Sequence, residues 1–193
     1  MISSTDTDVR PVNRKVLAVV AVLALLGAGL SGYMWYLSVE LKAAGYTAGI
    51  PICPETDLIS CKDVLLSRYA QWLGVPVAGA GFANYAALMV AAGLMATAGG
   101  GVRRALWTAA LVLAAIGTLA GLWLLGVQLL IIQKVCYLCD VVHVCGMVCL
   151  VLLLRVRPAG AAGGVYALAG GLAGVSLGVL VAGQAMFEPG QKG

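Results

Sequence analysis

The run ALWTAALVLAAIGTLAGLWLLGVQLLII, residues 105–132, contains no charged side chain. About 20 apolar residues in a helix span the roughly 30 Å hydrocarbon core of a bilayer, so this run is long enough to cross it. Four more apolar runs of sufficient length lie at residues 16–37, 76–98, 135–154 and 165–187. The sequence therefore predicts a protein that crosses a membrane five times.

The composition of the chain supports this interpretation. Of its 193 residues, 62% are hydrophobic and only 10% are charged, whereas soluble domains carry roughly 25% charged residues. The formal net charge of +4 is small and scattered, which argues against a nucleic-acid partner. This length allows one compact bundle, so we expect residues 1–193 to form a single all-α domain surrounded by membrane lipid.

The basic residues predict the orientation of the helices, because Lys and Arg gather next to cytoplasmic helix ends. If the N-terminus is inside, the inner segments carry only two acidic residues, Asp6 and Asp8. They carry seven basic residues: Arg10, Arg14, Lys15, Arg103, Arg104, Arg155 and Arg157. The outer segments carry more acidic than basic residues, and residues 38–75 form the long outer loop. The first run exceeds the 7–15 apolar residues of a signal peptide, so we expect it to be retained.

The long outer loop contains the first two cysteines, Cys53 and Cys61. Neighbouring glycines and prolines favour a turn that leaves Cys53 exposed. Ser60 followed by Asp63 matches a capping box, which predicts a short helix from Cys61 to about Leu73. This helix carries too much apolar surface to face water, so we expect it to lie flat on the bundle as a lid.

Cys136 and Cys139 form a C-x-x-C at the start of the fourth run. Residues at i and i+3 share one helix face, and thiolates near a helix N-terminus are stabilised by its unpaired N–H groups. Two membrane crossings separate this motif from Cys53 and Cys61, so both pairs lie on the outer side, where disulfides persist. Two thiol pairs that meet there suggest electron transfer by disulfide exchange.

Two polar residues inside the apolar runs are candidate ligand-binding groups. His143 returns to the face of the C-x-x-C one turn deeper, and an ionisable residue within a membrane is a functional candidate. Its alternative role is a hydrogen bond between helices. Asn84 is a similar buried group in the second run. Interhelical hydrogen bonds explain Gln128 and Gln133 adequately.

The remaining small residues indicate packing. Cys145 and Cys149 point away from Cys136 and are expected to be buried and inert. In the last run, Gly170, Gly174 and Gly178 form a ridge that would allow close approach to another helix.

Metal binding is the main rival explanation for the four outer cysteines. Structural zinc sites use two short knuckles of Cys or His, whereas Cys53 and Cys61 are eight residues apart. The sequence CYLCD at residues 136–140 also lacks the histidine of a haem-attachment motif. We therefore expect no metal.

The order of these residues over about 16–154 resembles the vitamin K epoxide reductase family: Cys53, Cys61, Ser67, Asn84 and the later Cys136-x-x-Cys139. The resemblance implies a four-helix bundle that holds a quinone of the ubiquinone, menaquinone or vitamin K type. By the same resemblance, Cys53 would meet a thioredoxin-like partner, Cys61 would exchange with Cys136, and Cys139 would act on the quinone. Ser67 and Asn84 would border the quinone pocket.

Two features depart from the vertebrate pattern. His143 stands where the vertebrate enzymes have a tyrosine, and the fifth run resembles the bacterial branch, where a fused thioredoxin-like domain often follows. We therefore expect an enzyme of a bacterial plasma membrane that reoxidises a separate, DsbA-like periplasmic protein. The alternative is that a thioredoxin-like domain fused to this chain was removed. The alternatives are vitamin K epoxide reduction in the endoplasmic reticulum and a non-catalytic membrane subunit stapled by disulfides.

Overall fold

The computed structural model describes residues 13–43, 50, 52–53, 55–158 and 163–186. Within these residues, five helical segments are long and apolar enough to cross a membrane. They are α1 (Arg14–Ala43), α3 (Val77–Met95), α4 (Gly100–Val127) with its π-helical continuation η2 (Gln128–Ile132), α5 (Tyr137–Arg155) and α6 (Gly163–Met186). Each coincides with one predicted run, so the all-α, multi-pass membrane fold is confirmed.

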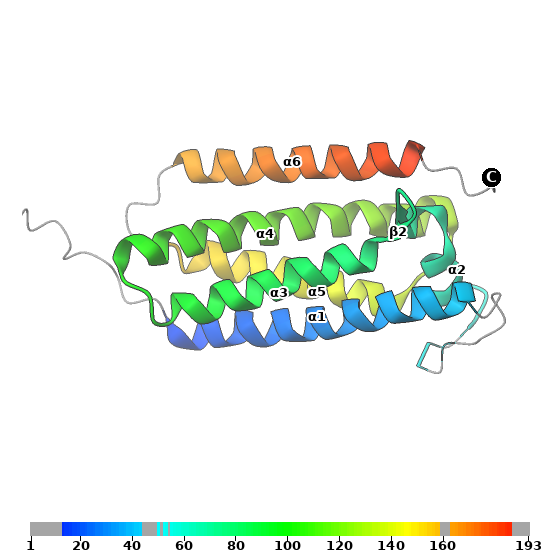
Figure 1. The fold of residues 1–193 in the computed structure, drawn as a ribbon, viewed down its shortest axis with the longest axis horizontal. Coiled ribbons are helices and arrows are strands. Elements are labelled where there is room, and N and C mark those ends of the chain that lie inside the picture. Colours follow the sequence, from blue (N-terminus) through cyan, green and yellow to red (C-terminus); the bar gives the residue numbers. More distant parts are fainter. Residues whose placement is uncertain (1–12, 44–49, 51, 54, 159–162, 187–193) are drawn as a thin grey trace, which may run out of the picture.

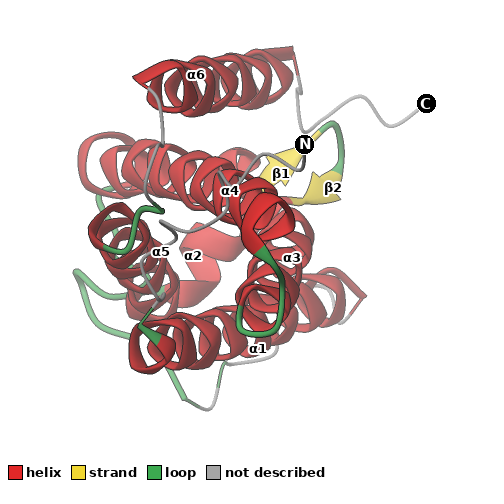
Figure 2. Ribbon diagram, turned by 90° about the vertical axis from the view of Figure 1, so that its left-hand side faces the viewer, coloured by secondary structure: helices red, strands yellow, loops and turns green. Residues whose placement is uncertain are grey.

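Four of these helices form a bundle, which Figure 2 shows nearly end on. Helices α1 and α4 each pack against both α3 and α5, whereas α6 lies outside the ring against α4. The indole N–H of Trp107 on α4 donates to the carbonyl of Leu153 on α5 at 2.9 Å. The hydroxyl of Tyr85 on α3 donates to the carbonyl of Val142 on α5. These buried bonds join α5 to α4 and to α3.

Both cysteine pairs lie at one end of the bundle, where α1 and α4 end and α3 and α5 begin (Figure 1). The opposite end carries basic residues, among them Arg14, Arg103 and Arg155. The prediction that two crossings return the chain to the side it left is therefore confirmed. Whether residues 1–193 form one domain stays a prediction.

The lid over the cysteine end differs from the predicted helix. Helix α2 (Cys61–Leu66) is followed by the 3-10 turn η1 (Arg68–Ala70) and by a small hairpin of β1 (Gln71–Trp72) and β2 (Val75–Pro76). The continuous helix to Leu73 was therefore wrong. Leu73 and Gly74 have φ angles of 49° and 86°, the left-handed conformation that a two-residue hairpin turn requires.

Helix α2 has one of the two hydrogen bonds that a capping box predicts. The side chain of Ser60 accepts the N–H of Asp63 at 3.1 Å. The carboxylate of Asp63 is exposed, and the N–H of Ser60 donates instead to the carbonyl of Val135 at 3.1 Å. A contact distant in sequence thus replaces the reciprocal bond of the capping box.

The predicted glycine ridge of α6 faces away from the bundle. A Cβ added to Gly170, Gly174 or Gly178 would meet nothing within 4 Å among the described residues. Helix α6 instead buries Ala169, Ala173 and, near its C-terminal end, Gly183 and Gln184. Among the described residues, no helix approaches the ridge closely, and its use in helix packing stays a prediction.

Candidate functional site

The four outer cysteines form two disulfides, Cys53–Cys61 and Cys136–Cys139. All four are buried, with exposed fractions between 0% and 9%. The expectation that Cys53 is exposed was wrong, because only 5% of its surface is exposed. The flanking Pro51 and Pro54 lie outside the described residues. Cys145 and Cys149 are buried, as predicted, and their thiols are free; that they are inert stays a prediction.

Backbone pairing brings the two disulfides together. A parallel bridge pairs Ile59 with Val135, and the N–H of Ser60 donates to the carbonyl of Val135. Cys61 follows this bridge on one chain segment and Cys136 follows it on the other. The bridge therefore places Cys61 and Cys136, which the family resemblance pairs for exchange, two residues and one residue beyond the same point of main-chain pairing.

Two side chains strengthen this contact between the outer loop and the start of α5. The ammonium group of Lys134 donates to the carbonyl of Asp57 at 2.7 Å, and the hydroxyl of Tyr137 donates to the carbonyl of Ile52. Both bonds join residues just before or at the start of α5 to the loop that carries Cys53.

One sulfur of each disulfide accepts a hydrogen bond from the first turn of a helix. The sulfur of Cys136, the N-cap of α5, accepts the N–H of Cys139 at 3.3 Å. The sulfur of Cys53 accepts the N–H of Cys61, the first residue of α2, at 3.2 Å. Such N–H groups stabilise the thiolate formed on reduction, which favours thiol exchange at both pairs.

Gln128 positions the C-x-x-C, a role that sequence reasoning missed. Its side chain is 2% exposed and comes from η2, the π-helical end of α4. The amide oxygen accepts the backbone N–H of Cys136 at 2.6 Å, and the amide nitrogen donates to the carboxylate of Asp140 at 3.3 Å. An amide side chain eight positions before the motif, in a run with no charged residue, was the available signal.

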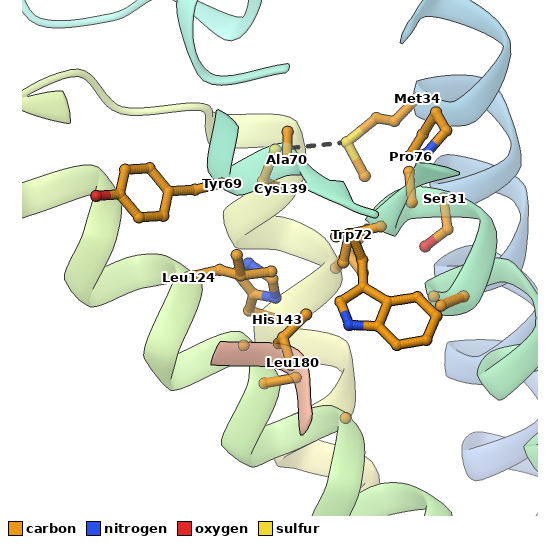
Figure 3. Close-up of a pocket in the computed structure, with 18 of the residues that line it drawn as sticks. Ser31, Met34, Tyr69, Ala70, Trp72, Pro76, Leu124, Cys139, His143 and Leu180 are labelled. Carbon is orange, nitrogen blue, oxygen red and sulfur yellow. Dashed lines mark hydrogen bonds between the residues drawn. The ribbon is translucent and has the colours of Figure 1, made fainter. Parts of the chain in front are cut away.

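A cavity of about 350 Å³ lies between the helices and the lid. Its lining is mostly apolar, and Cys139 and His143 border it together (Figure 3). Ser67 and Asn84 border the same cavity, so all three predicted polar residues line one cavity that Cys139 also borders. Cys136, the partner of Cys139, does not line the cavity.

The sulfur of Cys139 also contacts the thioether sulfur of Met34 on α1 at 3.5 Å. Each of the three polar side chains has a distinct setting. The Nε2 atom of His143 is buried and has no hydrogen-bond partner among the described residues. The hydroxyl of Ser67 donates to the carbonyl of Val64 at 2.8 Å, so its proton is used within the lid.

Close helix approach fixes the histidine and the asparagine. A Cβ on Gly121 of α4 would lie 2.8 Å from Nδ1 of His143, so only glycine leaves room for the ring there. A Cβ on Gly117 would lie 3.0 Å from the amide nitrogen of Asn84. These two glycines, one turn apart, were not singled out from the sequence.

The chain also matches a known protein family. The family model described as the Vitamin K epoxide reductase family matches residues 18–154, more than two thirds of the chain. The matched segment contains all four disulfide-bonded cysteines and ends at the close of α5, so α6 lies beyond it. No curated protein matches the chain significantly. The chain therefore belongs to the vitamin K epoxide reductase family, whose members are oxidoreductases that act on disulfides.

Proposed function

We propose that this protein is a quinone-dependent thiol oxidoreductase that reoxidises a thioredoxin-fold partner. One observation carries the proposal. Cys139 borders an apolar cavity, while its disulfide partner Cys136 follows the backbone bridge that also leads to Cys61. The two sulfurs of one C-x-x-C thus face two different electron-transfer partners.

Three exchanges would complete the cycle, each moving two electrons. A dithiol of the partner reduces Cys53–Cys61 and itself becomes a disulfide. The thiolate of Cys61 attacks Cys136, which breaks the Cys136–Cys139 bond and leaves Cys139 as a thiolate. Cys53 then displaces Cys136 and restores Cys53–Cys61. Finally, Cys139 and Cys136 give up two electrons and two protons and re-form their disulfide.

The cavity suits a quinone, which supplies an acceptor for two electrons and two protons. Its volume and its mostly apolar lining with a few polar groups are typical of small-molecule sites. Leaving a buried polar atom unpaired costs about 1–3 kcal/mol, so a carbonyl acceptor for the Nε2 atom of His143 would be stabilising. The amide of Asn84 is a second donor on the cavity wall.

We place the enzyme in a bacterial plasma membrane, with the N-terminus in the cytoplasm and both disulfides in the periplasm. The distribution of basic residues supports this orientation, since Arg14, Arg103 and Arg155 all lie at the end opposite the disulfides. The disulfides themselves favour an oxidising compartment.

A reconstituted assay tests the proposal. Purified protein is mixed with a reduced thioredoxin-fold donor and a soluble ubiquinone or menaquinone analogue, and quinone absorbance and donor thiols are followed together. We expect one quinone reduced for each donor disulfide formed, and none with Cys139→Ala. A donor that exchanges disulfides with the protein while neither quinone is reduced would refute the proposal, as would fixed disulfides that never exchange.

A further inference from the structure

Helix α6 lies outside both the four-helix bundle and the segment matched by the family model, yet it borders the cavity. Its contribution comes from Ser176, Leu177, Val179 and Leu180. Figure 3 shows Leu180 among the lining side chains that also include Cys139 and His143. The bundle and lid alone therefore do not complete the wall of this cavity.

The lid hairpin is fastened to α6 by Trp72. Its indole N–H donates to the carbonyl of Val179 at 3.2 Å. The same indole lies against Gly183, where an added Cβ would come within 2.1 Å of the indole nitrogen. Any side chain at position 183 must therefore displace Trp72, which itself lines the cavity.

A second fastening uses Gln184, which is 1% exposed in a helix that is otherwise almost entirely apolar. Its side-chain oxygen accepts the indole N–H of Trp123 on α4 at 2.8 Å. Its side-chain nitrogen donates to the carbonyl of Tyr69 in the lid. We call Trp72, Trp123, Gly183 and Gln184 the α6 anchor.

The cavity reaches the surface of the protein beside this anchor. Its lining runs from the buried Cys139 to exposed apolar side chains, namely Val75 of the hairpin, Ala80 of α3 and Val179 of α6. Figure 2 shows the hairpin on the side of α4 where α3 and α6 approach it. Ala80 and Val179 of this rim belong to helices that are long and apolar enough to cross a membrane, so the rim matches an apolar chain.

We propose that α6 is a component of the quinone site: it forms the wall along which a polyprenyl tail leaves between α3 and α6, and the α6 anchor sets the width of that exit. The proposal rests on the quinone-dependent function above. It assigns Val179 and Leu180 to the tail, and it assigns the anchor to positioning the wall rather than to electron transfer.

Photoaffinity labelling of the wild-type protein tests this assignment without measuring turnover. The probe is a quinone with a diazirine on the first unit of a polyprenyl tail, and the labelled peptides are mapped with and without excess unlabelled quinone. We expect competed label at residues 176–180 and 77–81. Competed label confined to other segments would overturn the role of α6. No competed label anywhere, together with no quinone reduction, would instead overturn the proposed function and this inference with it.

A pair of glycine substitutions on one helix tests the anchor. Gly183→Ala must displace Trp72, whereas Gly178→Ala faces open space. We expect Gly183→Ala to raise the KM for a polyprenyl quinone about tenfold with little change in kcat. In Gly183→Ala, disulfide exchange with the donor should match wild type. In Gly178→Ala, the KM, kcat and disulfide exchange should all match wild type.

Gln184→Leu removes the second fastening and replaces Gly183→Ala in this test if that variant does not fold. It should raise the KM for the polyprenyl quinone and lower the amount of photolabel at residues 176–180. Equal KM values and equal labelling for a folded anchor variant and Gly178→Ala would refute the role of the anchor.

Discussion

The backbone N–H of Cys136 donates a 2.6 Å hydrogen bond to the side-chain oxygen of Gln128. Cys136 is the N-cap of α5, and N–H groups at the start of a helix have no partner within it. Gln128 supplies that partner from the end of α4. The C-x-x-C is thereby held in a fixed place relative to the helix that forms one wall of the cavity.

Gln128→Leu should destabilise the protein and slow transfer into the C-x-x-C. A buried N–H left without its acceptor costs about 1–3 kcal/mol. Thermal unfolding in detergent measures the loss, and rapid-quench trapping measures exchange between Cys61 and Cys136. Gln133→Asn is the control, because Gln133 is exposed and Asn tolerates its left-handed backbone. Identical unfolding and exchange in the two variants would contradict a positioning role for Gln128.

His143→Ala should slow quinone reduction by roughly 10²–10³, the effect of removing one preorganised donor in other enzymes. Exchange between the two cysteine pairs should remain intact, because His143 borders the cavity and not the bridge between the pairs. Single-turnover measurements separate the two steps. If the variant loses stability while turnover per folded molecule is unchanged, the histidine has a packing role only.

Gly121→Ala should impair quinone reduction although position 121 carries no functional group. The added Cβ would lie 2.8 Å from Nδ1 of His143, so the ring must move. Displacing a catalytic group by about 1 Å can reduce a rate by about 10². Gly126→Ala on the same helix meets nothing within 4 Å and is the matched control. Equal turnover in the two variants would show that the position of the ring is unimportant.

Much of the fold follows from the sequence, because each helix that crosses a membrane requires an apolar run of a minimum length. The five apolar runs predict the five helices, and the parity of the crossings puts both cysteine pairs at one end. The side chain of Ser60 caps α2 as the local pattern indicates. These features depend on interactions between residues close in sequence or on the number of membrane crossings.

The details of the site depend on contacts between distant segments, which the sequence pattern does not reveal. Cys53 is buried because its loop pairs with residues near Val135. The predicted helix ends at Leu66 because Ser67 is extended and the hairpin turn follows. Gln128 reaches Cys136 from the π-helical turn that ends α4, a turn that the apolar run does not reveal. Each of these requires the tertiary structure.

The proposed orientation can be tested at two exposed loop positions in a cysteine-free background. Asp57→Cys lies at the disulfide end, and Thr97→Cys lies in the turn between α3 and α4 at the opposite end. In intact cells, a membrane-impermeant maleimide should label Asp57→Cys and leave Thr97→Cys unlabelled until the membrane is opened. The reverse pattern would invert the topology and remove the periplasmic partner.

Transfer between the two cysteine pairs is the central claim, and Cys139→Ala tests it most directly. In this variant the thiolate of Cys136 has lost its partner and can attack Cys61, which releases Cys53 as a thiol without any added oxidant. Non-reducing peptide mapping identifies the bond, and Cys145→Ala serves as the control that keeps both native disulfides. The account predicts that a Cys61–Cys136 disulfide accumulates in Cys139→Ala. Recovery of Cys53–Cys61 alone, with Cys136 remaining a free thiol, would contradict it.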